Sequence, residues 1–115
     1  MLVRIDPGSS EALFAQVADA IRAEIEAGRA RPGDRLPPAK TLAESLGVNM
    51  HTVLHAYQDL RDEGLIDLRR GRGAVVTDAA GAIAELRRDI AQLGRRATAL
   101  GMSPATVVAL VRASL

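Results

Sequence analysis

The sequence contains no cysteine and no tryptophan, and Phe14 and Tyr57 are its only phenylalanine and tyrosine. Without cysteine, the chain has no disulfide, no thiolate nucleophile and no cysteine-ligated zinc. Two such rings are too few for the stacking platforms on which proteins bind single-stranded nucleic acid. The core must therefore be aliphatic, and a chain of 115 residues that is 48% hydrophobic can form one modest core.

Long apolar runs and an excess of one charge are also missing. Residues 1–6 lack the apolar core of a signal peptide, and no later run approaches the length that spans a bilayer. We therefore expect a cytoplasmic protein that does not bind membranes. The net charge is +1, and residues 1–78 hold ten basic and twelve acidic residues. A protein that coats polyanions through bulk positive charge has a different composition.

Three helices are predicted in the first part of the chain. Residues 11–27 carry apolar side chains at helical spacing, and Ser9 or Ser10 is available to cap their start. Two shorter helices are predicted over residues 39–46 and from residue 50 or 51 to 63. The short glycine-containing link between them is typical of a helix-turn-helix.

A β-hairpin is predicted directly after these helices. Leu65–Leu68 and Ala74–Thr77 are short apolar strands, and the segment Arg69–Gly73 forms the tip that joins them. The predicted fold is mainly α with a small β-hairpin (α+β), a winged helix-turn-helix. In that fold the third helix fits the major groove, and the arginine-bearing tip reaches flanking phosphates.

The chain beyond residue 78 has a different pattern. Apolar residues recur there at alternating spacings of three and four, and Ser103-Pro104 then begins a last helix. We predict two domains, residues 1–78 for DNA binding and residues 79–115 as a two-helix dimerisation tail. An amphipathic helix beyond a complete domain needs a partner, which favours a homodimer over a tail that folds back on the winged domain. The predicted dimer contacts are Ile83, Leu86, Ile90, Leu93, Ala97, Leu100, Val107, Leu110 and Val111.

Four motifs follow one another in fixed order. They are Pro-Gly-Asp-Arg-Leu-Pro at 32–37, Leu-Gly-Val-Asn at 46–49, Glu-Gly-Leu-Ile at 63–66 and Arg-Gly-Arg-Gly at 70–73. With them, residues 5–78 resemble the GntR family of bacterial transcription regulators. The short tail resembles the YtrA-type subgroup, in which the tail mainly dimerises the protein. The resemblance implies a homodimeric regulator that binds double-stranded DNA at an inverted-repeat operator. We expect a repressor, but the residues do not separate repression from activation of transcription.

The family's DNA-contact positions can be carried over one by one. They fall on the second helix, on the third helix with its entry, and on the hairpin tip; the residue pattern itself adds Arg35 and Arg69. The expected DNA-contacting residues are Arg35, Lys40, Asn49, His51, Thr52, His55, Arg69, Arg70, Gly71, Arg72 and Gly73. Arg35 is expected either to contact DNA or to hold Asp34 or the chain near the second helix.

The sequence departs from the family pattern at four positions. Pro38 stands where many relatives have serine, so a hydroxyl that could cap the second helix is absent. Lys40 replaces arginine and loses the bidentate geometry of a guanidinium. Met50 and Leu54 are apolar where polar residues are common, which indicates an altered sequence preference. Leu54 could instead touch a thymine methyl group.

Other functions find less support in the residues. His51 and His55 are four apart, but Thr52 stands where a zinc-protease motif has glutamate, and no third ligand is evident. We expect no metal, no cofactor and no enzymatic activity, because no nucleophile–base set or phosphate-binding loop is present. A winged-helix module for protein–protein interaction is the alternative function. The sequence also leaves room for a small-molecule effector, which it does not identify.

Overall fold

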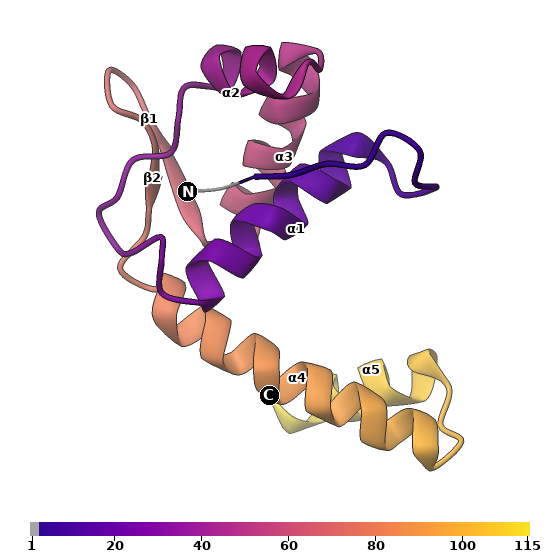
Figure 1. Ribbon diagram of the computed structural model, residues 1–115. Helices are drawn as coiled ribbons and strands as arrows, with labels where there is room; N and C mark the ends of the chain where they lie inside the picture. Colours follow the sequence, from indigo (N-terminus) through magenta and orange to yellow (C-terminus); the bar gives the residue numbers. More distant parts are fainter. Residues whose placement is uncertain (1–2) are drawn as a thin grey trace. The chain divides into compact units, whose positions relative to one another are not determined.

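The structure is a computed structural model, and it describes residues 3–115 (Figure 1). Contacts divide the chain into two compact units, one ending at Ala84 and one comprising Glu85–Leu115. The elements are α1 (Leu13–Glu26), α2 (Ala39–Leu46), α3 (Met50–Asp62), β1 (Ile66–Arg69), β2 (Gly73–Val76), α4 (Ala80–Ala99) and α5 (Pro104–Ser114). The predicted fold class, mainly α with a small β-hairpin, is confirmed. None of the helices in residues 3–115 is long and apolar enough to cross a lipid bilayer.

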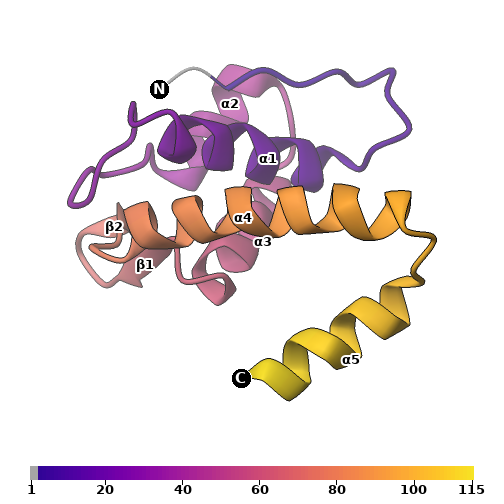
Figure 2. The same ribbon diagram turned by 90° about the horizontal axis from the view of Figure 1, so that it is seen from below.

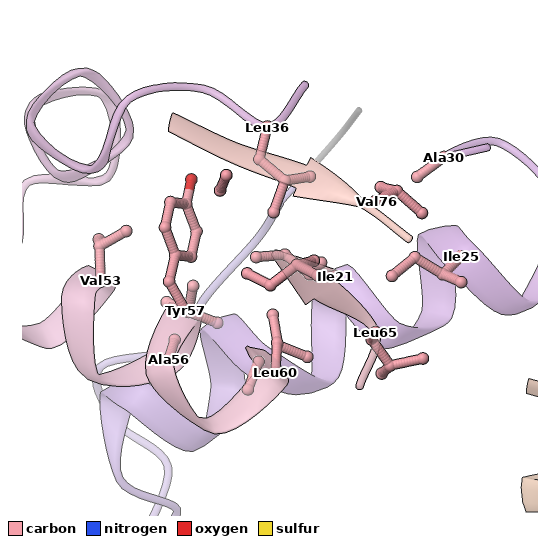
Figure 3. Close-up of a cluster of buried hydrophobic side chains, with 14 of the residues drawn as sticks. Ile21, Ile25, Ala30, Leu36, Val53, Ala56, Tyr57, Leu60, Leu65 and Val76 are labelled. Carbon is pink, nitrogen blue, oxygen red and sulfur yellow. The ribbon is translucent and has the colours of Figure 1, made fainter. Parts of the chain in front are cut away.

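The core of the first unit forms where α3 packs against α1 and the hairpin. Figure 3 shows Val53, Tyr57 and Leu60 on one side of α3, pointing toward Ile21 of α1. These side chains are almost fully buried, and apart from Tyr57 they are aliphatic, as the sequence predicts. The Tyr57 hydroxyl donates a hydrogen bond to the carbonyl oxygen of Pro37 at 2.6 Å. Burial raises the pKa of Tyr57 to about 12, so the phenol stays neutral over the physiological range.

The start of α1 differs from its prediction. A cap by Ser9 or Ser10 is wrong: Ala12 occupies the N-cap position, and no side chain among residues 3–115 caps the helix. The buried Gln16 holds the preceding segment instead. Its Oε1 accepts a hydrogen bond from the Asp6 N–H at 2.6 Å, and its Nε2 donates to the Asp6 carbonyl at 3.0 Å. These side-chain hydrogen bonds tie the segment before α1 to the helix over ten residues.

The corner between α2 and α3 follows from two residues. Gly47 ends α2 with a φ of +70°, a left-handed conformation that favours glycine. Asn49 then caps α3, and its Oδ1 accepts a hydrogen bond from the His51 N–H at 2.8 Å. The bounds of α2 agree with the prediction, and α3 ends at Asp62, one residue before the predicted end.

The hairpin is antiparallel, with Ile66 opposite Val76, and its strands lie within a residue of the predicted bounds. A segment before α2 joins its outer edge. The Leu36 N–H donates to the Ala74 carbonyl at 2.8 Å, and the Val76 N–H donates to the Asp34 carbonyl at 2.8 Å. The hairpin is therefore fastened to the chain that leads into the helix-turn-helix.

An ion pair ties α1 to the end of α3. Arg22 donates from Nε and Nη2 to the two carboxylate oxygens of Glu63, at 2.7 Å and 2.6 Å. Arg22 also contacts Asp19 at 2.6 Å. The hydrogen bond to Glu63 raises the pKa of Arg22. This two-pronged, charge-assisted pair links α1 to the C-terminal end of α3.

The tail consists of two helices. Ala80 and Ala84, in the first part of α4, are buried in the core of the first unit, which therefore extends past residue 78. After α4 the chain reverses at Gly101, and Figure 2 shows α5 turning back from the end of α4. Ser103 caps α5 by accepting a hydrogen bond from the Thr106 N–H at 3.2 Å, and Pro104 occupies the first turn, as predicted.

Candidate nucleic-acid interface

The outward face of α3 is the first part of the candidate site. The core takes one side of α3, and the other side carries exposed residues at helical spacing. The residues on this face that are exposed or half-buried are Met50, His51, Thr52, Leu54, His55 and Gln58. Gln58 was missed by the sequence reasoning, although it follows His55 by three positions and Leu54 by four. A glutamine amide can pair with an adenine edge in the major groove.

Asn49 and His51 lie at the N-terminal end of this face. Asn49 caps α3 through its side-chain Oδ1, so its side-chain Nδ2 group is available as a hydrogen-bond donor. His51 is exposed, one position into the helix. Neither α2 nor α3 has an acidic residue in its first turn, so the partial positive charge of each N-terminus is not neutralised there. Such helix ends attract phosphate groups.

His55 is held by α1. Its ring stacks on Phe14, with ring centroids 3.8 Å apart and planes inclined by 13°. Its Nε2 lies 3.7 Å from a carboxylate oxygen of Asp59, one turn further along α3. The side chain is still half exposed, but one ring face is covered. The predicted DNA-contacting role of His55 therefore competes with a role in packing α3 on α1.

The wing arginines differ in their surroundings. Arg69 contacts the carboxylate of Asp67 at 3.1 Å, so its charge is partly neutralised. Arg70 and Arg72 are exposed, and within residues 3–115 no acidic side chain forms a salt bridge with either. The two exposed cations lie on either side of Gly71, which takes a φ of +79° in the tight turn.

Arg35 makes a contact with the hairpin that the alternatives left open by the sequence did not include. Its Nε donates a hydrogen bond to the carbonyl oxygen of Arg72 at 3.1 Å. Its backbone also bridges Val75 on the edge of the hairpin. Arg35 therefore holds the tip of the wing, and its guanidinium is exposed beside it.

Lys40 adds an exposed cation on α2. It is the second residue of α2 and is exposed. Figure 1 shows α2, the start of α3 and the turn of the hairpin on the same side of the first unit. Between α3 and the wing is a hollow of about 350 Å³, lined mainly by apolar side chains, with Arg69 and Arg70 also contributing to its wall.

The candidate dimer contacts differ in how exposed they are. Large apolar side chains on α4, in the turn after it and on α5 are exposed: Leu86, Ile90, Leu93, Leu100, Leu110 and Val111. Val107 is half-buried, and it lines a groove of about 380 Å³ between α4 and α5. Ile83 differs, because it packs against the core of the first unit. Ala97 is buried as well.

His51 and His55 have no third metal-ligating side chain grouped with them in the part of the chain that the structure describes. Within residues 3–115, no group of three or more His, Asp or Glu side chains is placed to hold a metal ion.

Comparison with known proteins places these features in one family. The family model for bacterial regulatory proteins of the gntR family matches residues 13–76. The HTH-type transcriptional repressor YtrA of Bacillus subtilis is 35% identical over 79 residues, which is 69% of this chain and 61% of that protein. This chain thus matches about three fifths of the length of that relative.

Two solved structures are also similar to this chain. YtrA from Sulfolobus acidocaldarius, a GntR-family transcription factor, is 37% identical, with a TM-score of 0.68 over 86% of this chain and 99% of the other. The DNA-binding domain of AraR, solved in complex with operator ORX1, is 30% identical, with a TM-score of 0.58 over 64% of this chain and 92% of that one.

The fold and the exposed helix beside a cationic wing define a winged-helix DNA-binding protein of the kind that regulates transcription. Both YtrA proteins are named as regulators of transcription, and neither is named as an enzyme. Within that class, the chain belongs to the GntR family of bacterial regulatory proteins.

Proposed function

We propose that this chain binds double-stranded DNA as a homodimer, at an inverted-repeat operator, and represses transcription. The observation that carries the proposal is the exposed face of α3 together with Arg70 and Arg72 of the wing, which form no salt bridge within residues 3–115. A helix of this kind enters the major groove, and flanking cations contact phosphates. The relative YtrA is named a repressor, and AraR was solved with its operator, which supports the assignment.

The contacts divide by their expected roles. His51, Thr52 and the amide of Asn49 lie at the N-terminal end of α3, where recognition helices contact base edges. Arg70 and Arg72 contact phosphates, because both are exposed and neither forms a salt bridge within residues 3–115. Arg35 is a positioning residue for the wing tip through its bond to the Arg72 carbonyl.

The apolar surface of the tail supports the proposed homodimer. Exposed leucine, isoleucine and valine side chains on α4 and α5 form an apolar surface that water disfavours, and contiguous surfaces of this kind mark interfaces. A two-fold dimer presents two copies of α3 to two half-sites, which requires an inverted repeat.

The experiment is selection of bound duplexes from a random pool with the full chain. We expect an inverted repeat with one fixed separation between its halves. Recovery of no preferred duplex in dilute buffer would contradict the proposal. It would favour the protein–protein interaction module, because such a module has no salt-dependent affinity for DNA.

Two matched arginine variants then test the phosphate contacts. Arg72→Ala removes an exposed, unpaired cation, so the slope of log affinity against log salt concentration should flatten by about one. Arg69→Ala removes a cation that Asp67 already neutralises in part, so it should change the slope less. Fluorescence anisotropy with the selected duplex over a range of salt concentrations measures both. Equal slopes for the wild type and the Arg72→Ala variant would remove Arg72 from the interface.

A further inference from the structure

The outward face of α3 carries a strip of apolar side chains, which cannot form hydrogen bonds with the edges of DNA bases. Met50 is 40% exposed in the first turn, and Leu54 follows on the same face one turn later. Leu54 also lines the hollow between α3 and the wing, together with Pro38 and Leu68, and Leu68 is 39% exposed. The strip therefore continues from the helix toward the wing.

The chemistry of the major groove limits what such a strip can face. Thymine presents a C5 methyl group there, and the other groups that the four base pairs offer are hydrogen-bond donors and acceptors. An apolar side chain placed over a donor or acceptor would leave that group buried without a partner, which is costly. Lys40 on α2 and Arg70 at the turn of the hairpin are both exposed, and their charges favour a polyanion over an apolar protein partner.

We propose that Met50 and Leu54 determine specificity by contacting the C5 methyl groups of thymines in each half-site. The inference rests on the proposed function, since it requires that α3 enters the major groove. Four residues of helix span about 6 Å. Successive base pairs are about 3.4 Å apart. The two thymines contacted should therefore lie about two base-pair steps apart.

Deoxyuridine provides the test, because it lacks only the methyl group of thymidine and keeps every hydrogen-bonding atom. Each thymine of the selected duplex is replaced in turn, and the affinity of the full chain is measured by fluorescence anisotropy. We expect replacement at two thymines in each half-site to weaken binding about fourfold each, the factor that corresponds to one buried methyl group. Replacement at the other thymines should change affinity less than twofold.

Variants connect each methyl group to its side chain. Leu54→Ala should abolish the loss at one of the two thymines, and Met50→Ala should abolish the loss at the other. His51→Ala is the matched control on the same face and should keep both losses. Leu54 is half-buried, so if Leu54→Ala fails to fold, the more exposed Met50→Ala carries the test.

The outcomes separate this inference from the proposed function. Tight binding that is unchanged by deoxyuridine at every position would overturn the methyl readout and leave DNA binding intact. A variant that weakens thymidine and deoxyuridine duplexes equally would assign a structural role to its residue and would also overturn the readout. Selection that recovers no duplex would overturn the proposed function and this inference with it.

Discussion

The two units of this chain use similar aliphatic residues in opposite ways. In the first unit, Val17, Ile21 and Leu60 are completely buried among α1, α3 and the hairpin. In the second unit, the side chains of Leu86 and Leu100 are 58% and 68% exposed. The first unit closes its core with its own elements, whereas the second leaves an apolar face open. Amphipathic spacing alone therefore does not determine whether the apolar face of a helix is covered by its own chain or by another.

The largest expected effect comes from the closed core. Leu60→Ala should lower the free energy of unfolding by about 2–5 kcal/mol, because it removes a buried side chain and leaves a cavity. Urea denaturation of the full chain measures it. The loss should be the same at different protein concentrations.

Leu86→Ala should instead give a loss that depends on protein concentration, since its side chain is proposed to be buried only by a second copy. A loss of similar size and concentration dependence in both variants would erase the contrast between the units.

The open face of the tail gives the second effect. Ile90→Asp places a charge in the proposed dimer interface, and the dimer dissociation constant should rise about a hundredfold, or roughly 3 kcal/mol. Sedimentation equilibrium measures the change. Gln92→Asp adds the same charge at an exposed position of α4 that is outside the seam, and it serves as the control. If the two variants associate equally well, the interface has been assigned to the wrong face.

The smallest effect sharpens the description of the closed core. Tyr57→Phe removes the hydrogen bond to Pro37 and should cost about 1 kcal/mol at neutral pH. The pKa of Tyr57 is raised to about 12 in the folded state, so the stability contributed by the neutral phenol is complete below pH 10. That contribution is lost as the pH rises from about 10 to about 12. The free energy of unfolding should therefore fall more steeply over that interval for the wild type than for the Phe variant. Parallel pH profiles would show that the phenol is not desolvated in the native state.

Local signals in the sequence predicted most of the fold. Gly47, Asn49 and Ser103 each act through neighbouring residues, and the helix bounds they predict agree with the structure within one residue. The start of α1 was mispredicted: Ala12 is the N-cap residue and α1 has no side-chain cap, while Gln16 bonds to the backbone of Asp6, ten residues earlier.

Parts of the candidate site depend on contacts between distant segments and were beyond sequence reasoning. Phe14 and His55 meet only because α1 packs across α3. The bond from Arg35 to the wing tip spans 37 positions. Ile83 fits the spacing of the tail seam, yet it packs into the winged domain. Spacing shows which residues share a helix face, and it does not show which neighbour covers that face.

The mass of the complex between the full chain and its selected duplex tests the central claim most directly. Native mass spectrometry counts the chains bound to one duplex. Two chains on each inverted repeat are predicted, falling to one or none when Ile90→Asp opens the dimer. A single chain bound tightly by the wild type, or the same stoichiometry for the wild type and the Ile90→Asp variant, would contradict the claim that the open face of the tail pairs two winged domains on DNA.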